Sequence, residues 1–190
     1  MKALEDRILN EGIIINNDIL KVDSFLNHQI DPDLIDVLAE DIINFFKDVR
    51  VDKVLTIETS GIAIAYAVAR LLKTPIVFAK KSKSATVGDD VFTTEIKSFT
   101  RNSISTVTVR NKYLNENENI LIVDDFLAEG NAALGLIDIC NQAKSNVVGF
   151  ATAIEKGFQG GRKRIEAAGV KVYSGAIIKE FKDNKPVFEK

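Results

Sequence analysis

ILIVDDFLAEGNA, residues 120–132, is the stretch that decides the fold of this chain. Its first four residues form a continuous apolar run, as expected of a buried parallel strand. Asp124 and Asp125 follow, and a turn of small residues then leads into a helical pattern from Leu134 onward. The N–H groups of such a turn and of the helix behind it can hold a phosphate. The two acids can accept hydrogen bonds from sugar hydroxyls or hold a hydrated Mg²⁺. An ordinary strand–turn–helix connection with solvated acids is the alternative.

The composition narrows the class of protein. With 190 residues, 46% of them apolar, a single globular domain is expected. The net charge of −2 gives no overall field toward nucleic acid or a membrane surface. Cys140 is the only cysteine, which excludes an internal disulfide, and its helical apolar surroundings predict a buried structural thiol. Without an apolar run of membrane-spanning length or a signal peptide, we expect a cytoplasmic protein with neither nucleic-acid nor membrane partners.

Strands and helices alternate along the chain. This order predicts an α/β fold with a mostly parallel central sheet flanked by helices, whose strand ends gather on one ligand-binding edge. Helices are expected at 1–11, from Pro32 to about Phe46, from the turn that ends at Gly61 to Leu72, after residue 133, and at 161–168. Strands are expected at 53–57, 75–79, 120–123, 147–154 and 170–173, with paired strands at 13–22, at 92–99 with 103–109, and a closing segment at 177–187.

A second turn of the same kind follows the strand expected at 53–57. It contains Glu58, Thr59, Ser60 and Gly61, whose hydroxyls and N–H groups suit a second anion, although simple capping of the next helix explains the hydroxyls equally well. Two such turns on one edge suit a ligand that carries a phosphate at one end and a diphosphate at the other. The basic run Lys80, Lys81 and Lys83 would neutralise a diphosphate; a solvated loop is the alternative.

Two further segments carry chemistry. Lys156 and Phe158 follow the strand at 147–154 and can bind and stack on a flat heterocycle with carbonyl oxygens, or belong to a plain surface turn. Residues 20–31 are dense in polar side chains and include His28, the only histidine. With no other histidine and no nearby cysteine, a metal site built by the protein is not expected. The phosphate loop GxxxxGK[ST] and the dinucleotide motif GxGxxG are both absent.

The chain resembles the bacterial xanthine phosphoribosyltransferases over nearly its whole length. Residues 120–132 match the 5-phosphoribosyl 1-diphosphate (PRPP) motif of the type I phosphoribosyltransferases, and LKVDSFLNHQIDP (20–32) is specific to the xanthine enzymes. TIETSGIA (56–63), VFAKKSKS (77–84) and IEKGFQGGR (154–162) complete the likeness. It implies the type I fold over 1–190, with a small hood from about 1–35 plus 156–190 and a flexible hairpin lid over about 80–110.

The resemblance also implies a reaction. Xanthine and PRPP would give xanthosine 5′-monophosphate and diphosphate in purine salvage, with Mg²⁺ bound through PRPP and a homodimer as the working form. On matching positions, the 5′-phosphate would be held by Ala128, Glu129, Gly130, Asn131 and Ala132. The diphosphate would be held by Glu58 to Gly61 with Lys81, and the xanthine by Leu20, Asn27 and Lys156. Asp124 and Asp125 would face the ribose hydroxyls and, with Lys81, form the catalytic set, while Phe126 or Phe158 would stack on the purine.

Two positions depart from the wider pattern. Ala128 stands where hypoxanthine–guanine enzymes carry an aspartate base; xanthine is acidic and can enter already ionised, and otherwise Glu95, Asp89 or Asp90 of the lid is the candidate base. Asn131 and Ala132 stand where threonine is common, so phosphate binding would rest on backbone N–H groups. Two alternatives stay open: a guanine or hypoxanthine phosphoribosyltransferase, and a non-catalytic PRPP-binding purine regulator, against which the absence of a basic N-terminal helix-turn-helix counts.

Overall fold

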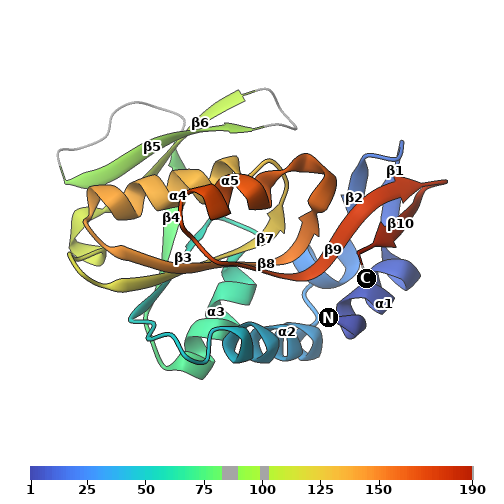
Figure 1. Cartoon of the computed structure of the whole chain (residues 1–190), viewed down its shortest axis with the longest axis horizontal. Helices are drawn as coiled ribbons and strands as arrows, with labels where there is room; N and C mark the ends of the chain where they lie inside the picture. Colours follow the sequence, from blue (N-terminus) through green and yellow to red (C-terminus); the bar gives the residue numbers. More distant parts are fainter. Residues whose placement is uncertain (83–89, 99–102, 190) are drawn as a thin grey trace.

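A computed structural model describes residues 1–82, 90–98 and 103–189. Its centre is a sheet that, over these residues, has eight strands in the order β10-β9-β8-β7-β3-β4-β6-β5 (Figure 1). The middle of the sheet is parallel and comprises β3 (Lys53–Ile57), β4 (Ile76–Ser82), β7 (Asn119–Leu127), β8 (Asn146–Lys156) and β9 (Val172–Lys182). Antiparallel strands flank it, namely β5 (Val91–Ser98), β6 (Ser103–Arg110) and β10 (Lys185–Phe188). The predicted mostly parallel sheet is therefore confirmed.

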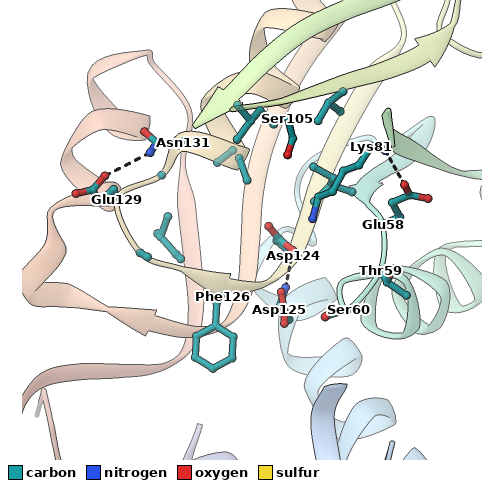
Figure 2. Close-up of a pocket in the computed structure, with 18 of the residues that line it drawn as sticks. Glu58, Thr59, Ser60, Lys81, Ser105, Asp124, Asp125, Phe126, Glu129 and Asn131 are labelled. Carbon is teal, nitrogen blue, oxygen red and sulfur yellow. Dashed lines mark hydrogen bonds between the residues drawn. The ribbon is translucent and has the colours of Figure 1, made fainter. Parts of the chain in front are cut away.

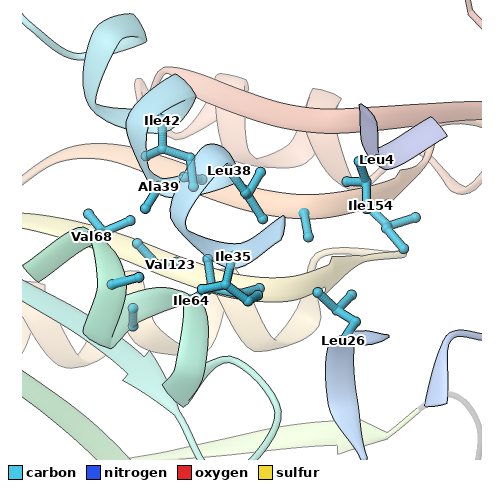
Figure 3. Close-up of a cluster of buried hydrophobic side chains, with 14 of the residues drawn as sticks. Leu4, Leu26, Ile35, Leu38, Ala39, Ile42, Ile64, Val68, Val123 and Ile154 are labelled. Carbon is cyan, nitrogen blue, oxygen red and sulfur yellow. The ribbon is translucent and has the colours of Figure 1, made fainter. Parts of the chain in front are cut away.

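Helices cover both faces of this sheet (Figure 1). One face carries α2 (Pro32–Phe45) and α3 (Ile62–Leu72), with α1 (Lys2–Glu11) at its end, and the other carries α4 (Asn131–Gln142) and α5 (Gly161–Ala167). Strand β7 supplies alternate side chains to two cores, because successive residues of a strand point to opposite faces. Leu121 and Val123 pack with α2 and α3, as Figure 3 shows for Val123, whereas Ile120 and Ile122 pack with α4.

The start of α2 shows how the sequence sets a boundary. Asp31 caps the helix: its Oδ1 accepts hydrogen bonds from the backbone N–H groups of Asp33 (3.1 Å) and Leu34 (3.2 Å). Pro32 occupies the first helical position, where its missing N–H costs nothing. Both features are as predicted, and the helix buries Leu38 and Ile42 completely against the sheet.

Two strands are longer than predicted. Strand β7 does not end at Val123 but pairs with β8 as far as Leu127, so Asp124 and Asp125 lie within the strand. Strand β9 runs without a break from Val172 to Lys182, where the sequence suggested a short strand and a separate closing segment. In both cases, main-chain pairing with β8 carries the strand through polar residues that interrupt its apolar pattern.

Short elements complete the fold. The N-terminal segment forms an antiparallel hairpin and a π-helical turn, β1 (Ile13–Ile15), β2 (Ile19–Lys21) and η1 (Asp23–Asn27); 3₁₀ turns lie at η2 (Asn111–Tyr113) and η3 (Gly157–Gln159). The tip of this hairpin joins the turn between β9 and β10: the Asn17 N–H donates to Asn184 Oδ1 (3.1 Å), and the Asn184 N–H donates to Asn17 Oδ1 (2.7 Å). The N- and C-terminal segments thus meet at one end of the molecule (Figure 1).

No helix in the described part of the chain combines the length and the apolar character needed to cross a membrane.

Candidate functional site

The site lies where the connections of two neighbouring strands diverge. Strands β3 and β7 are adjacent and parallel, but α3 follows β3 on one face of the sheet and α4 follows β7 on the other (Figure 1). Such a switch point opens a crevice at the carboxyl ends of the strands. A cavity of about 500 Å³ occupies it. Both predicted turns contribute to its lining, which comprises residues 57–60, 124–133, Lys81, Ile96, Ser105, Val107 and Phe150.

Asp124 and Asp125 lie between the two turns. Asp124 is 6% exposed, its Oδ1 accepts a hydrogen bond from the Asp125 N–H (2.9 Å), and Lys81 points toward it (Figure 2). Burial, and then the adjacent Asp125 carboxylate, raise the pKa of the Asp124 carboxyl well above its ordinary value, which Lys81 opposes. The cavity therefore contains a carboxyl group whose ionised form is stabilised by any cation or hydrogen-bond donor that a ligand supplies.

The turn after β3 is tied to the end of β4. Glu58 Oε1 accepts a hydrogen bond from the Lys81 N–H (2.6 Å; Figure 2). The Glu58–Thr59 peptide bond is cis. Gly61 does not line the cavity but lies directly behind it, since a Cβ at this position would come within 3.0 Å of Asp124 Oδ1. The structure thus brings Glu58, Thr59, Ser60 and Lys81 together on one wall.

The turn after β7 forms the opposite wall. Gly130 has a φ of +81°, a conformation that glycine adopts without a steric penalty, and α4 begins immediately after it. The first helical hydrogen bond runs from the Leu134 N–H to the Gly130 carbonyl (2.9 Å), so the N–H groups of the first turn have no acceptor inside the helix. Ala128 to Ala132 all line the cavity.

The β5–β6 hairpin closes the cavity from above. Strand β6 pairs with the end of β4, with Lys81 opposite Val107, and this register brings Ser105 and Val107 to the cavity (Figure 2). Sequence reasoning did not select Ser105, although the alternation over 103–109 places it on the same face as Val107. The candidate bases Asp90 and Glu95 are exposed and lie outside the cavity lining. Lys83 and Asp89 lie outside the described residues.

The three residues predicted for the heterocycle are not among the residues that line this cavity. Leu20 is buried in the core near α1, Asn27 is exposed at the end of η1, and Lys156 is half-buried at the end of β8. Lys156 Nζ donates a hydrogen bond to the Asp18 carbonyl (2.7 Å), which joins β8 to the β1–β2 turn, and burial lowers the pKa of this ammonium group.

The two aromatic candidates for stacking differ in position. Phe126 lines the cavity, whereas Phe158 packs edge-on against Phe181, with ring centroids 5.7 Å apart.

Among the described residues, no group of three or more His, Cys, Asp or Glu side chains is placed to hold a metal ion. Besides Glu58 and Glu129, one on each wall, the carboxylates that line the cavity are the adjacent pair Asp124 and Asp125. One or two carboxylates with substrate phosphates and water are typical of Mg²⁺ sites, so these residues fit a magnesium ion that is bound together with a phosphorylated ligand.

Comparisons with known proteins agree on a family. A family model described as a phosphoribosyl transferase domain matches residues 21–183. A Clostridioides difficile protein named xanthine phosphoribosyltransferase is 50% identical over 188 residues, 98% of each chain, and a Finegoldia magna protein of the same name is 48% identical over 189 residues, 100% of each chain. The fold is similar to that of a Giardia lamblia adenine phosphoribosyltransferase, with a TM-score of 0.77, 21% identity, and coverage of 92% of this chain and 96% of that one.

Proposed function

The chain belongs to the phosphoribosyltransferase family, and on that premise we propose that it is a xanthine phosphoribosyltransferase of purine salvage. It transfers the 5-phosphoribosyl group of PRPP to xanthine and releases diphosphate. The observation that carries the proposal is that two turns, each leading from a strand into a helix, form opposite walls of one cavity, with Asp124 and Asp125 between them. PRPP has the matching order of groups: a phosphate, a ribose with two hydroxyls, and a diphosphate.

Each group of PRPP has residues that suit it. The N–H groups of Ala128 to Ala132 and the first turn of α4 hold the 5′-phosphate; Asp124 and Asp125 accept hydrogen bonds from the ribose hydroxyls; Glu58 to Gly61 and Lys81 contact the diphosphate. The structure supports this assignment because all of these residues except Gly61 line the same cavity, and Gly61 lies directly behind Asp124.

The reaction is a displacement at the anomeric carbon. A nitrogen of the xanthine base forms the new bond to the anomeric carbon. At the same time the bond between this carbon and the diphosphate oxygen breaks, and diphosphate leaves with the electron pair. Positive charge develops on the sugar ring, and the Asp124–Asp125 pair stabilises it. Lys81 stabilises the negative charge of the leaving group. Ionised xanthine needs no base from the protein, in keeping with the alanine at position 128.

Mg²⁺ accompanies PRPP in this proposal. Asp124 and Asp125 are the residues that would hold it, together with phosphate oxygens and water, and when bound it neutralises charge on the diphosphate. Ligand binding with the metal bound favours the ionised form of Asp124, whose pKa is raised in the free protein.

Leu20, Asn27 and Lys156 form the xanthine site in the proposed hood, which comprises about residues 1–35 and 156–190. The Lys156–Asp18 hydrogen bond supports this grouping, because it joins the end of β8 to the hairpin that carries Leu20. Xanthine differs from hypoxanthine by a 2-oxo group, which Asn27 is suited to bind. Asn27→Asp should therefore reduce kcat/KM for xanthine more than for hypoxanthine, and equal losses would contradict this role.

The proposed lid spans about residues 80–110 and includes β5 and β6; residues 83–89 and 99–102 of this range lie outside the described residues. Its role is to exclude water from the reacting sugar. Ser105 supports it, because this residue belongs to the hairpin and lines the cavity.

A coupled ultraviolet assay tests the function. Purified protein is given PRPP and Mg²⁺ with xanthine, guanine, hypoxanthine or adenine, and Lys81→Gln serves as the impaired variant beside Lys144→Gln, an exposed surface control. Preference for xanthine, with loss of turnover in Lys81→Gln alone, is the expected result. Turnover of another base would overturn the roles of Leu20, Asn27 and Lys156. PRPP binding without any turnover would favour the regulator, and a DNA-binding assay at stated salt would then test that alternative.

The proposal includes a cytoplasmic homodimer. Support for the dimer comes from large apolar side chains exposed on α2 and α3, namely Val37, Phe45, Tyr66 and Leu71. Light scattering after size-exclusion chromatography should give twice the 20.9 kDa chain mass. A monomer at micromolar concentration would contradict this part of the proposal.

A further inference from the structure

Helix α5 packs directly behind the turn that follows β7. The Gly161 N–H, at the start of α5, donates a hydrogen bond to the Ala128 carbonyl (3.1 Å). The two backbones approach so closely that a Cβ on Gly130 would lie 3.2 Å from Gly161 Cα. The turn is therefore held from the side opposite the cavity by an element some thirty residues later in the sequence.

Arg164 adds a second tie between the same two elements. Its Nη1 donates to the Glu129 carbonyl (2.5 Å) and to Asn131 Oδ1 (2.8 Å), so one guanidinium nitrogen bridges the turn and the first residue of α4. Asn131 Nδ2 also contacts Glu129 Oε2 (3.3 Å). Arg164 itself does not line the cavity. Its side chain acts on the turn and not on the contents of the cavity.

These two ties fix the direction of the peptide groups in the turn. In a trans peptide, the C=O and the following N–H point in opposite directions, and the peptides after Ala128 and Glu129 are trans. Because both carbonyls are held toward α5, the N–H groups of Glu129 and Gly130 are directed away from α5, to the cavity side. The N–H groups on which phosphate binding depends are thus oriented before any ligand arrives.

We propose that Arg164 is a positioning residue for the 5′-phosphate of PRPP: it holds the Glu129–Asn131 turn in the orientation that binds the phosphate. This inference rests on the proposed function of the turn as a phosphate site. Preorganised N–H donors bind an anion without first losing backbone entropy. Loss of the tie should therefore weaken phosphate binding while leaving the diphosphate wall intact.

The test compares Arg164→Gln with Lys163→Gln, which removes the same charge from the next residue of α5; both side chains are exposed. Isothermal titration calorimetry measures the affinities of each protein for PRPP, ribose 5-phosphate and diphosphate, all with Mg²⁺. In Arg164→Gln, the Kd values for PRPP and ribose 5-phosphate should rise about tenfold, equivalent to about 1.4 kcal/mol, with diphosphate unchanged. Arg164→Lys should recover only part of the affinity, since an ammonium lacks the planar fork of donors. In turnover, KM for PRPP should rise while kcat at saturation stays within about twofold.

Three results would overturn the inference. One is equal affinity for ribose 5-phosphate in the two glutamine variants, and another is an equal loss of diphosphate affinity, which would indicate a general structural effect. The third is no binding of ribose 5-phosphate by the unmodified protein. Failure of the proposed function is distinguishable, because a protein that binds PRPP but does not use xanthine still yields the binding comparison between Arg164→Gln and Lys163→Gln. Urea denaturation of each variant confirms that it is folded.

Discussion

The ion pair between Glu155 and Arg162 allows a stability effect to be worked out from the structure. Glu155, near the end of β8, is 2% exposed, and its carboxylate accepts hydrogen bonds from Arg162 Nε (3.0 Å), Arg162 Nη2 (2.6 Å) and Ser174 Oγ (2.5 Å). Arg162→Met keeps the aliphatic part of the side chain but removes the guanidinium. The Glu155 carboxylate would then be buried with a single hydroxyl donor.

Removing one partner of a buried ion pair costs about 3–5 kcal/mol. The Arg162 side chain is 28% exposed, so water can reach part of the space that it leaves, and we expect a loss at the lower end, about 3 kcal/mol. For a chain of this length, each kcal/mol lowers Tm by about 2–4 °C, which gives a decrease of about 6–12 °C. Replacing Glu155 by Gln in the same protein removes the unpaired charge, so Glu155→Gln/Arg162→Met should be more stable than Arg162→Met alone.

Urea denaturation followed by circular dichroism at neutral pH measures these free energies, and a double-mutant cycle isolates the pair. The matched control is Arg70→Met. Arg70 pairs with Asp36 at 2.7 Å, but both side chains are 49% exposed, so its loss should cost less than about 1 kcal/mol. The reasoning is refuted if Arg162→Met costs no more than Arg70→Met, or if the double variant is no more stable than Arg162→Met.

Three further predictions concern other buried groups. Because burial and Asp125 raise the pKa of Asp124, the folded protein keeps a proton that the unfolded chain releases as pH rises through the ordinary carboxyl range, so the wild type loses stability there. Asp124→Asn should therefore be more stable than wild type at pH 8 and nearly equal to it at pH 3 by urea denaturation, with lower turnover; an equal difference at both pH values would contradict this. Burial raises the pKa of the Cys140 thiol to about 12, so Ellman's reagent should react only as the protein unfolds, and rapid labelling of native protein would show the thiol to be accessible. Gly61→Ala would place a Cβ 3.0 Å from Asp124 Oδ1 and 3.2 Å from its Cα; we expect a loss of about 1–3 kcal/mol in stability and at least a tenfold fall in kcat/KM, and unchanged kinetics would exclude this close packing.

The sequence predicted the elements of the fold well because their signals are local. The Asp31–Pro32 start of α2 and the apolar run of β7 need no tertiary information to be recognised. The ends of β7 and β9 were placed too early for the opposite reason. Beyond Val123, the strand is maintained by main-chain pairing with β8, and no side-chain pattern records such pairing when acids or small residues interrupt the apolar run.

The candidate site also combines residues that local sequence signals predict with residues that only the tertiary structure brings together. The two turns were found because each combines a strand end, small residues and a helix start within a few positions. Arg164 was missed because its partners, Glu129 and Asn131, lie more than thirty residues away and carry no matching charge pattern. Ser105 was missed because only the pairing of β6 with β4 brings it to the cavity.

The meeting of the N- and C-terminal segments has a consequence for the order in which the protein folds during synthesis. The amino group of Met1 donates a hydrogen bond to the Gly175 carbonyl, 174 residues later, and Asn17 exchanges hydrogen bonds with Asn184. At roughly 5–20 residues per second, α1 leaves the ribosome about 10–30 s before β9 exists to receive it. The contacts of α1 with β9 and β10 therefore form late, while β3, β7 and β8 can already pair. Helix α1 therefore completes its packing only after the strands that lie far behind it in the sequence have been made.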